Sequence, residues 1–122
     1  MVSKELISYV STNTTLTLGT DLFWGIFPND TRAGIIISDL PGIHNESGMG
    51  GFQILVNSRY KDYNTALTKI HLVYDLLAFS NGFNLTTYTV FNTVSISTPG
   101  FLGRDDIGNV LFGALIRLYT EV

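Results

Sequence analysis

The chain has 122 residues, of which 45% are hydrophobic and only 14% are charged, and its formal net charge is −3. Seven scattered Lys and Arg residues in an acidic chain argue against a protein that grips nucleic acid electrostatically. The absence of cysteine excludes disulfides and thiolate chemistry, and the length predicts one domain, residues 1–122, around one core.

Hydrophobic periodicity and turn residues predict an α+β fold. Apolar residues three and four positions apart indicate helices, whereas β-branched and aromatic runs bounded by Gly and Pro indicate strands. The expected elements are a helix at 4–10, strands at 21–27, 34–39 and 52–57, a helix from 62 to about 80, and strands at 86–98 and 110–122. The order α-β-β-β-α-β-β predicts a mixed or antiparallel β-sheet of about five strands, with two helices packed on one face.

The two helices have recognisable ends. Ser3 and Asp62 are the expected N-caps, and Asn81-Gly82 predicts the end of the second helix. The second helix carries an apolar stripe at helical spacing, made of Ala66, Ile70, Val73 and Leu77. Further apolar residues beside this stripe predict that the helix contacts two surfaces.

Residues 41–51 are predicted to form a mobile loop, because they contain four glycines and one proline. Its segment Ser47-Gly-Met-Gly-Gly-Phe52 resembles a phosphate-binding loop only superficially. It runs into a strand rather than a helix, and it lacks the Lys-Ser/Thr pair that reaches the phosphates. A hinge or flap is the favoured interpretation.

The C-terminal third contains the most distinctive segment, the glycine-punctuated loop at 98–108. It combines apolar and charged side chains at a turn, which is typical of a contact element. In the preceding strand, Val90, Val94 and Ile96 are expected on one face. The final strand, 110–122, is apolar on both faces, so we expect it to be central in the sheet or to lie at a subunit contact.

Each candidate for chemistry lacks a necessary partner. His71 and Asp75 lie one helical turn apart, as two metal ligands could, but a third ligand is missing and a solvated contact is favoured. His44 and Glu46 lie in the glycine-rich loop with nothing to orient them. The adjacent Asp105-Asp106 side chains should point apart, with Arg104 beside them. We therefore predict no catalytic, cofactor-binding or metal site.

Ser, Thr and Asn take the place of the missing charges. Such a surface has weak self-repulsion and a small desolvation cost on contact, so it suits a subunit that packs against copies of itself; a charge-poor monomer is the alternative. The N-terminus has no apolar signal region, and the longest apolar run, 110–116, is too short for a membrane span.

Several motifs together resemble a family of small phage proteins. They are Leu18-Gly-Thr-Asp-Leu-Phe23, Ile35-Ile-Ile-Ser-Asp-Leu-Pro-Gly42, Lys61-Asp-Tyr63 and Pro99-Gly-Phe-Leu-Gly-Arg-Asp-Asp-Ile-Gly108. With them the chain resembles the phage minor capsid protein family, which is similar to the tail-terminator or tail-completion proteins of long-tailed (siphovirus-type) phages. The likeness covers nearly the whole chain, and the Leu-Gly-Arg-Asp element is its most specific part. The glycine-rich loop at 47–51 departs from the pattern.

This resemblance implies a structural virion protein of the phage neck, and not an enzyme. It implies a homo-oligomer, a hexameric ring, that caps the tail tube, stops its polymerisation and provides the head-joining interface. The implied partners are the tail tube protein and a head-completion or connector protein, and DNA would cross the lumen without sequence-specific binding. The protein would act in the virion after assembly in the host cytoplasm.

Two alternatives stay open, a head-completion or stopper protein of the neck and a small ligand-binding or enzymatic domain using the His44 loop. For the ring, the hypothesis assigns assembly contacts to the loop and to the last strand. These residues are Phe101, Leu102, Arg104, Asp105, Asp106, Leu115, Arg117 and Tyr119.

Overall fold

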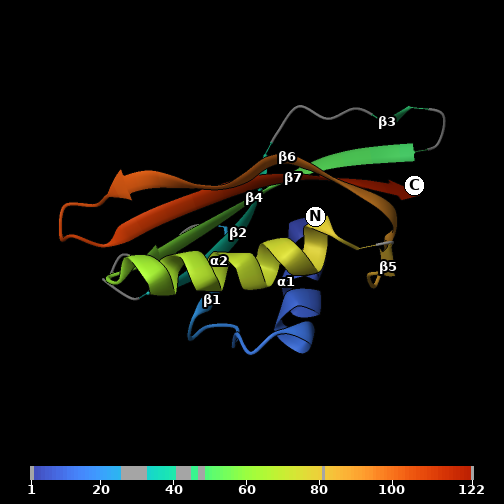
Figure 1. Cartoon of the computed structure of the whole chain (residues 1–122). Helices are drawn as coiled ribbons and strands as arrows, with labels where there is room; N and C mark the ends of the chain where they lie inside the picture. The colour runs from blue at the N-terminus through green and yellow to red at the C-terminus, as the bar shows by residue number, and fades with distance from the viewer. Residues whose placement is uncertain (1, 26–32, 41–44, 47–48, 81, 122) are drawn as a thin grey trace.

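The computed structural model describes residues 2–25, 33–40, 45–46, 49–80 and 82–121. Two helices, α1 (Val2–Asn13) and α2 (Tyr63–Ala78), lie against the same face of one sheet (Figure 1). The strands are β1 (Leu22–Trp24), β2 (Gly34–Leu40), β3 (Asn45–Glu46), β4 (Met49–Tyr60), β5 (Phe83–Asn84), β6 (Thr89–Arg104) and β7 (Val110–Glu121). The α+β class is confirmed, and β3 and β5, of two residues each, are additional to the expected strands.

The described strands form a mixed sheet in the order β1-β2-β4-β7-β6-β5, with β3 paired to β4. β1 and β2 are parallel, and the other pairs are antiparallel. β4 and β7 pair along their whole length, from Met49 opposite Glu121 to Tyr60 opposite Val110. β7 is therefore a central strand, as its apolar pattern on both faces predicted.

The core lies between the sheet and the helices. Alternate residues of β7 point into it, and the predicted stripe of α2 is buried against them. The buried residues of these two elements are Val110, Phe112, Ala114, Ile116, Leu118 and Thr120 of β7, and Ala66, Ile70, Val73, Tyr74 and Leu77 of α2. Both helices contribute to one continuous cluster, so burial of apolar area holds them to the sheet.

The N-terminus of α2 is capped as predicted. The Asp62 side chain accepts hydrogen bonds from the Thr65 amide at 2.9 Å and from the Thr65 hydroxyl at 3.0 Å. These bonds, with the amide bond first in importance, lower the pKa of Asp62. Regular helix ends at Ala78, slightly before the expected Asn81-Gly82 signal, and Gly82 takes a positive φ of 118°.

The prediction that Ser3 caps α1 is wrong. The helix already includes Val2, and Ser3 is completely buried inside it. The indole Nε1 of Trp24 donates to Ser3 Oγ at 2.6 Å, and Ser3 Oγ donates to Asp39 Oδ2 at 2.5 Å. Ser3 thus joins α1 to β1 and β2.

The predicted end of the β6 strand at Thr98 is also wrong. β6 continues through Pro99 to Arg104, and the register shifts at several points along it. β5 pairs only with Thr89 and Val90, so no described strand pairs with the outer edge of β6 around Pro99. Pro99 has no backbone N–H to donate, and none is needed at this unpaired edge. The bulge after Val90 also changes the alternation, so Val90 is buried against the helices while Val94 lies opposite Arg117 on the other face.

The predicted loop at 41–51 is shorter than expected, because β4 begins at Met49. Residues 41–44 and 47–48 lie outside the described part of the chain, so the predictions for His44 and for Ser47 and Gly48 of the glycine-rich segment fall outside it. Among the described helices, neither is long and apolar enough to span a membrane.

Candidate assembly surface

The helices leave one side of the sheet uncovered, which we call the open face. It is formed by the alternate residues of β4 and β7 that point away from the helices, together with their neighbours on β6. Leu55 of β4 lies opposite Leu115 of β7, and both are half-buried. The three predicted contact residues on β7, Leu115, Arg117 and Tyr119, are therefore on this face.

Exposed apolar side chains are concentrated on β6. Each of them exposes more than a third of its surface, and they are Phe91, Val94, Ile96, Phe101 and Leu102. Phe91 also contacts the ring of Tyr119, with centroids 6.5 Å apart. A contiguous strand with this much exposed apolar surface is typical of a protein contact.

The β6–β7 hairpin ends in a tight turn that Asp105 holds together. Its carboxylate accepts hydrogen bonds from the Ile107 amide at 3.1 Å, the Asn109 amide at 2.8 Å and the Asn109 side chain at 3.0 Å. Arg104 Nη1 donates to the Gly108 carbonyl at 3.0 Å. Arg104 and Asp105 thus stabilise the turn itself.

The electrostatics of Asp105 agree with that role. Desolvation acts to raise the pKa of Asp105, but the hydrogen bonds from Asn109 and Ile107, together with the nearby Arg59 guanidinium, lower it below its ordinary value. The carboxylate is therefore charged at neutral pH and bound into the turn. Its neighbour Asp106 is exposed, and so Asp105 and Asp106 do not form a paired acid–base site.

The predicted contact residues Phe101 and Leu102 point to opposite sides of the sheet. Phe101 lies opposite Phe112 on the helix side and packs near Tyr63 at the start of α2, with centroid distances of 5.8 and 5.7 Å. Leu102 instead lies over Gly113 on the open face. Phe101 therefore anchors the hairpin to α2, and Leu102 is available on the open face.

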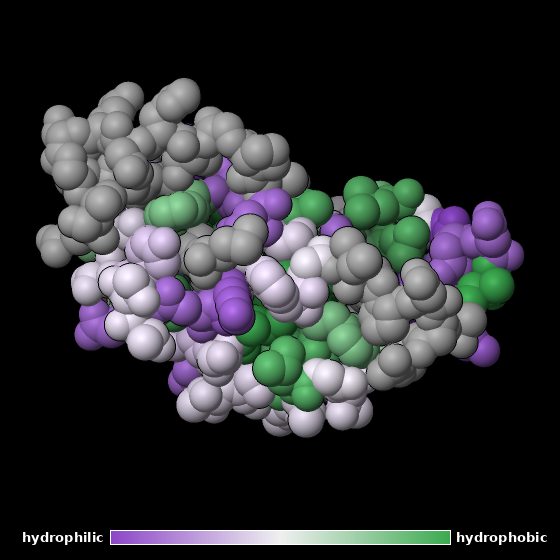
Figure 2. Space-filling view, turned by 180° about the vertical axis from the view of Figure 1, so that it is seen from behind, coloured by the Kyte–Doolittle hydropathy of each residue, from purple (hydrophilic) through white to green (hydrophobic). Residues whose placement is uncertain are grey.

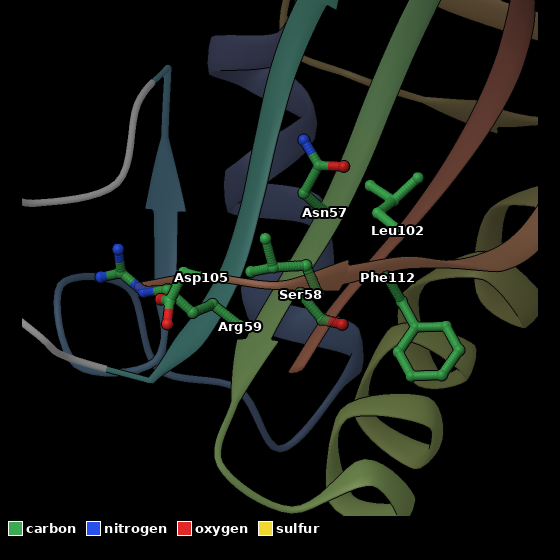
Figure 3. Close-up of a pocket in the computed structure, with 7 residues that line it drawn as sticks. Asn57, Ser58, Arg59, Leu102, Asp105 and Phe112 are labelled. Atoms are coloured by element: carbon green, nitrogen blue, oxygen red, sulfur yellow. The ribbon is translucent and has the colours of Figure 1, made fainter. Parts of the chain in front are cut away.

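Leu102 forms one wall of a groove of about 250 Å³ at the base of the hairpin (Figure 3). The lining residues are Asn57, Ser58, Arg59, Leu102, Asp105, Leu111 and Phe112. Figure 3 shows Asn57 directed toward Leu102, and Arg59 beside Asp105. The buried Asn57 Oδ1 has no hydrogen-bond partner among the described residues, so the groove combines apolar walls with an unused polar group.

Arg117 is a half-buried cation on the open face. It lies opposite Gln53 of β4 and Val94 of β6, and its Nη1 donates to the Tyr119 hydroxyl at 3.4 Å. Its Nε is buried and has no hydrogen-bond partner within the described part of the chain. A guanidinium in this position favours a partner that brings a carboxylate.

His71 and Asp75, the candidates for metal binding, lack a third ligand among the described residues. His71 Nδ1 and Asp75 Oδ1 are 3.3 Å apart on the outer side of α2, and their side chains are 42% and 55% exposed. They border an open depression lined also by Leu67, Thr68 and Leu72. Within the described residues, no group of three potential ligands surrounds a common point.

Sequence reasoning missed Asn57, Arg59 and Gly113 as members of the groove. The alternation of the predicted strand at 52–57 already separated Asn57 from the buried Ile54 and Val56. A glycine inside an apolar strand is a known sign of close approach by another group, so Gly113 also carried a signal. Arg59 lies beyond the predicted end of that strand, and no sequence pattern indicated its place in the groove.

Comparison with known proteins gives the family. Residues 9–121 match the family model described as the bacteriophage tail terminator protein. A chain of the virion of a native gene transfer agent (GTA) particle shares the fold with a TM-score of 0.57, at 15% identity over 96% of this chain and 85% of that chain. No curated protein matches the sequence significantly. The family match spans nearly the whole chain, and the chain therefore belongs to the bacteriophage tail terminator protein family, a family of structural virion components.

Proposed function

We propose that this protein terminates the tail of a long-tailed phage as a homohexameric ring that caps the tail tube, stops its polymerisation and provides the interface for head joining. The family match over residues 9–121 is the observation that carries this proposal. A role by contact alone needs complementary surfaces and no reacting groups, and we propose that the protein is not an enzyme.

The exposed surfaces support self-association. The open face and the outer edge of β6 combine apolar side chains with few charges, and only 14% of the residues in the chain are charged. Contact between such surfaces removes apolar area from water at a small cost in desolvated charge. Head-to-tail contacts between copies close into a ring when the rotation between neighbours divides a full turn.

The ring would have one side for the tail tube protein and one for the head-completion or connector protein. The scattered basic residues and the net charge of −3 support a lumen that DNA crosses without binding. The protein would act in the virion neck after assembly in the host cytoplasm.

Deletion of the gene from the phage tests this role. Loss of a terminator should give overlong tail tubes, seen by electron microscopy, and supply of the wild-type protein in trans should restore normal length. Loss of a stopper protein would instead give tails of normal length and heads that leak DNA. Normal tails in the deletion phage would contradict the proposal.

A further inference from the structure

The tip of the β6–β7 hairpin carries an unused carboxylate. Asp106 is exposed, and beside it Ile107 is 55% exposed. In Figure 1 this hairpin projects past the start of α2, and in Figure 2 hydrophilic and hydrophobic atoms lie side by side at the same projecting end, on the right. The tip is therefore open to a partner.

Asp106 differs from every other carboxylate whose side chain the structure describes, because each of the others accepts a hydrogen bond. The donors are the Thr87 amide to Glu5, the Thr17 amide to Asp21, Ser3 to Asp39, Thr65 to Asp62, and Asn109 to Asp105, while His71 contacts Asp75. Within this described set, Asp106 alone has no such contact.

Arg117 is the matching cation. Arg117 is half-buried opposite Gln53 and Val94, next to the opposed pair Leu55 and Leu115 on the same face, and its Nε lacks a partner in the described part of the chain. Removing a guanidinium from water without a carboxylate is costly, so an ion pair here is favourable once the face is covered. The apolar residues near Arg117 would contact an apolar side chain that lies beside that carboxylate on the partner.

The two groups of one chain cannot meet. A strand rises about 3.3 Å per residue, so Arg117 lies roughly 23 Å along β7 from Val110, where the strand begins beside the tip. An Asp106–Arg117 pair therefore has to join two copies.

We propose that the hairpin tip of each copy docks on the open face of the next copy, with Asp106 paired to Arg117 and Ile107 packed against Leu55 and Leu115. Tip and face are different surfaces, so the contact is head-to-tail and leaves a free tip at one end and a free face at the other until a ring closes. This inference rests on the proposed ring and names the contact that builds it.

Charge exchange tests the pairing. Asp106→Arg and Arg117→Asp should each weaken assembly at least about tenfold, measured by native mass spectrometry over a range of concentrations, because like charges then meet. A 1:1 mixture of the two variants should assemble again as a ring of alternating subunits, since every tip then faces an opposite charge. The double variant Asp106→Arg/Arg117→Asp should also assemble.

Asp75→Arg is the matched control, because Asp75 is an exposed carboxylate on α2, away from the open face. It should assemble like the wild type. Circular dichroism reports whether each variant folds, and Ile107→Asp offers a second disruption at the exposed tip if Arg117→Asp unfolds.

The failures are distinguishable. If the wild type forms rings and both Asp106→Arg and Ile107→Asp form them equally well, the hairpin contact is wrong and the ring function stands. If folded single variants dissociate but their mixture does not assemble, the pairing is also wrong. A wild type that stays monomeric at all concentrations, with and without tail tubes, overturns the proposed function itself.

Discussion

Leu102 lies directly over Gly113 on the open face, where a β-carbon on Gly113 would come within 2.8 Å of Leu102 Cδ1 and 2.9 Å of Asn57 Oδ1. Both contacted atoms are side-chain ends, and Leu102 is 63% exposed, so they can move aside. Gly113→Ala should therefore lower the free energy of unfolding by only about 1 kcal/mol.

The same substitution should weaken oligomer formation more strongly, because it displaces Leu102 from the groove. Urea unfolding and native mass spectrometry measure the two effects separately. Leu102→Ala is the control, since it removes the displaced side chain without crowding and should reduce assembly in the same way. A Gly113→Ala protein with wild-type assembly would show that Leu102 is not a contact residue.

Tyr60 provides a prediction at alkaline pH. Burial, with Asp21 nearby as the smaller cause, raises the pKa of Tyr60 to about 12, and its buried hydroxyl has no hydrogen-bond partner among the described residues. A raised folded-state pKa gives stability that is complete below the unfolded value of about 10 and is lost as pH rises toward 12. Tyr60→Phe should remove that part of the pH dependence.

At neutral pH, Tyr60→Phe should keep or raise stability, because it removes a buried hydroxyl that makes no bond in the described structure. Urea unfolding at several pH values between 8 and about 12 compares the two proteins. Tyr63→Phe, at an exposed ring, is the control and should follow the wild-type curve. Equal alkaline slopes in Tyr60→Phe and wild type would contradict the prediction.

Asp105→Ala should affect both folding and assembly, whereas the sequence analysis assigned Asp105 to an assembly contact alone. The substitution removes three hydrogen bonds that hold the turn, while Arg104→Ala removes one. Thermal unfolding should therefore show a larger loss for Asp105→Ala than for Arg104→Ala.

The pH dependence of this effect has a definite sign. Because the pKa of Asp105 is lowered in the fold, its contribution is present above the unfolded value of about 3.9 and is lost as pH falls through the folded value. The stability difference between wild type and Asp105→Ala should thus shrink below about pH 4. A constant difference down to acid pH would argue against the role of Asp105.

Ser3→Ala should cost about 1–3 kcal/mol, because it leaves the Trp24 indole and the Asp39 carboxylate without their shared hydroxyl. Ser8→Ala, at an exposed position of α1, is the matched control and should change stability little. Urea unfolding measures both. Equal stability of the two variants would mean that the hydroxyl adds no net stabilisation.

Much of the fold could be predicted because its determinants are local. The α2 stripe and its Asp62 cap are set by side chains within a few residues of each other, and both are confirmed. The apolar pattern on both faces of residues 110–122 predicted a strand that is central in the sheet or lies at a subunit contact, and β7 is central in the sheet order. The family resemblance rested on motifs spread over the chain, and it is confirmed as well.

The candidate surface depended on contacts between distant segments. The sequence grouped Phe101, Leu102, Arg104 and Asp105 as one contact element, whereas the fold uses Phe101 to hold α2 and Asp105 to hold the turn. The role of Phe101 depends on α2 and on the pairing of β6 with β7, which no local pattern encodes. The partners of Asp105, Ile107 and Asn109, lie two and four residues further along the chain, so that role was open to local reasoning.

The sequence by itself determined the fold class, the main order of elements, the start of α2 and the family, because periodicity and capping act over one or two helical turns or a few strand residues. Only the tertiary structure decided which face each β6 residue occupies, since every bulge reverses the alternation after it. It also decided that Ser3 links three elements and that, within the described residues, Arg117 Nε and the Asp106 carboxylate have no hydrogen-bond partner. These features arise from strand register and long-range packing, which no local pattern encodes.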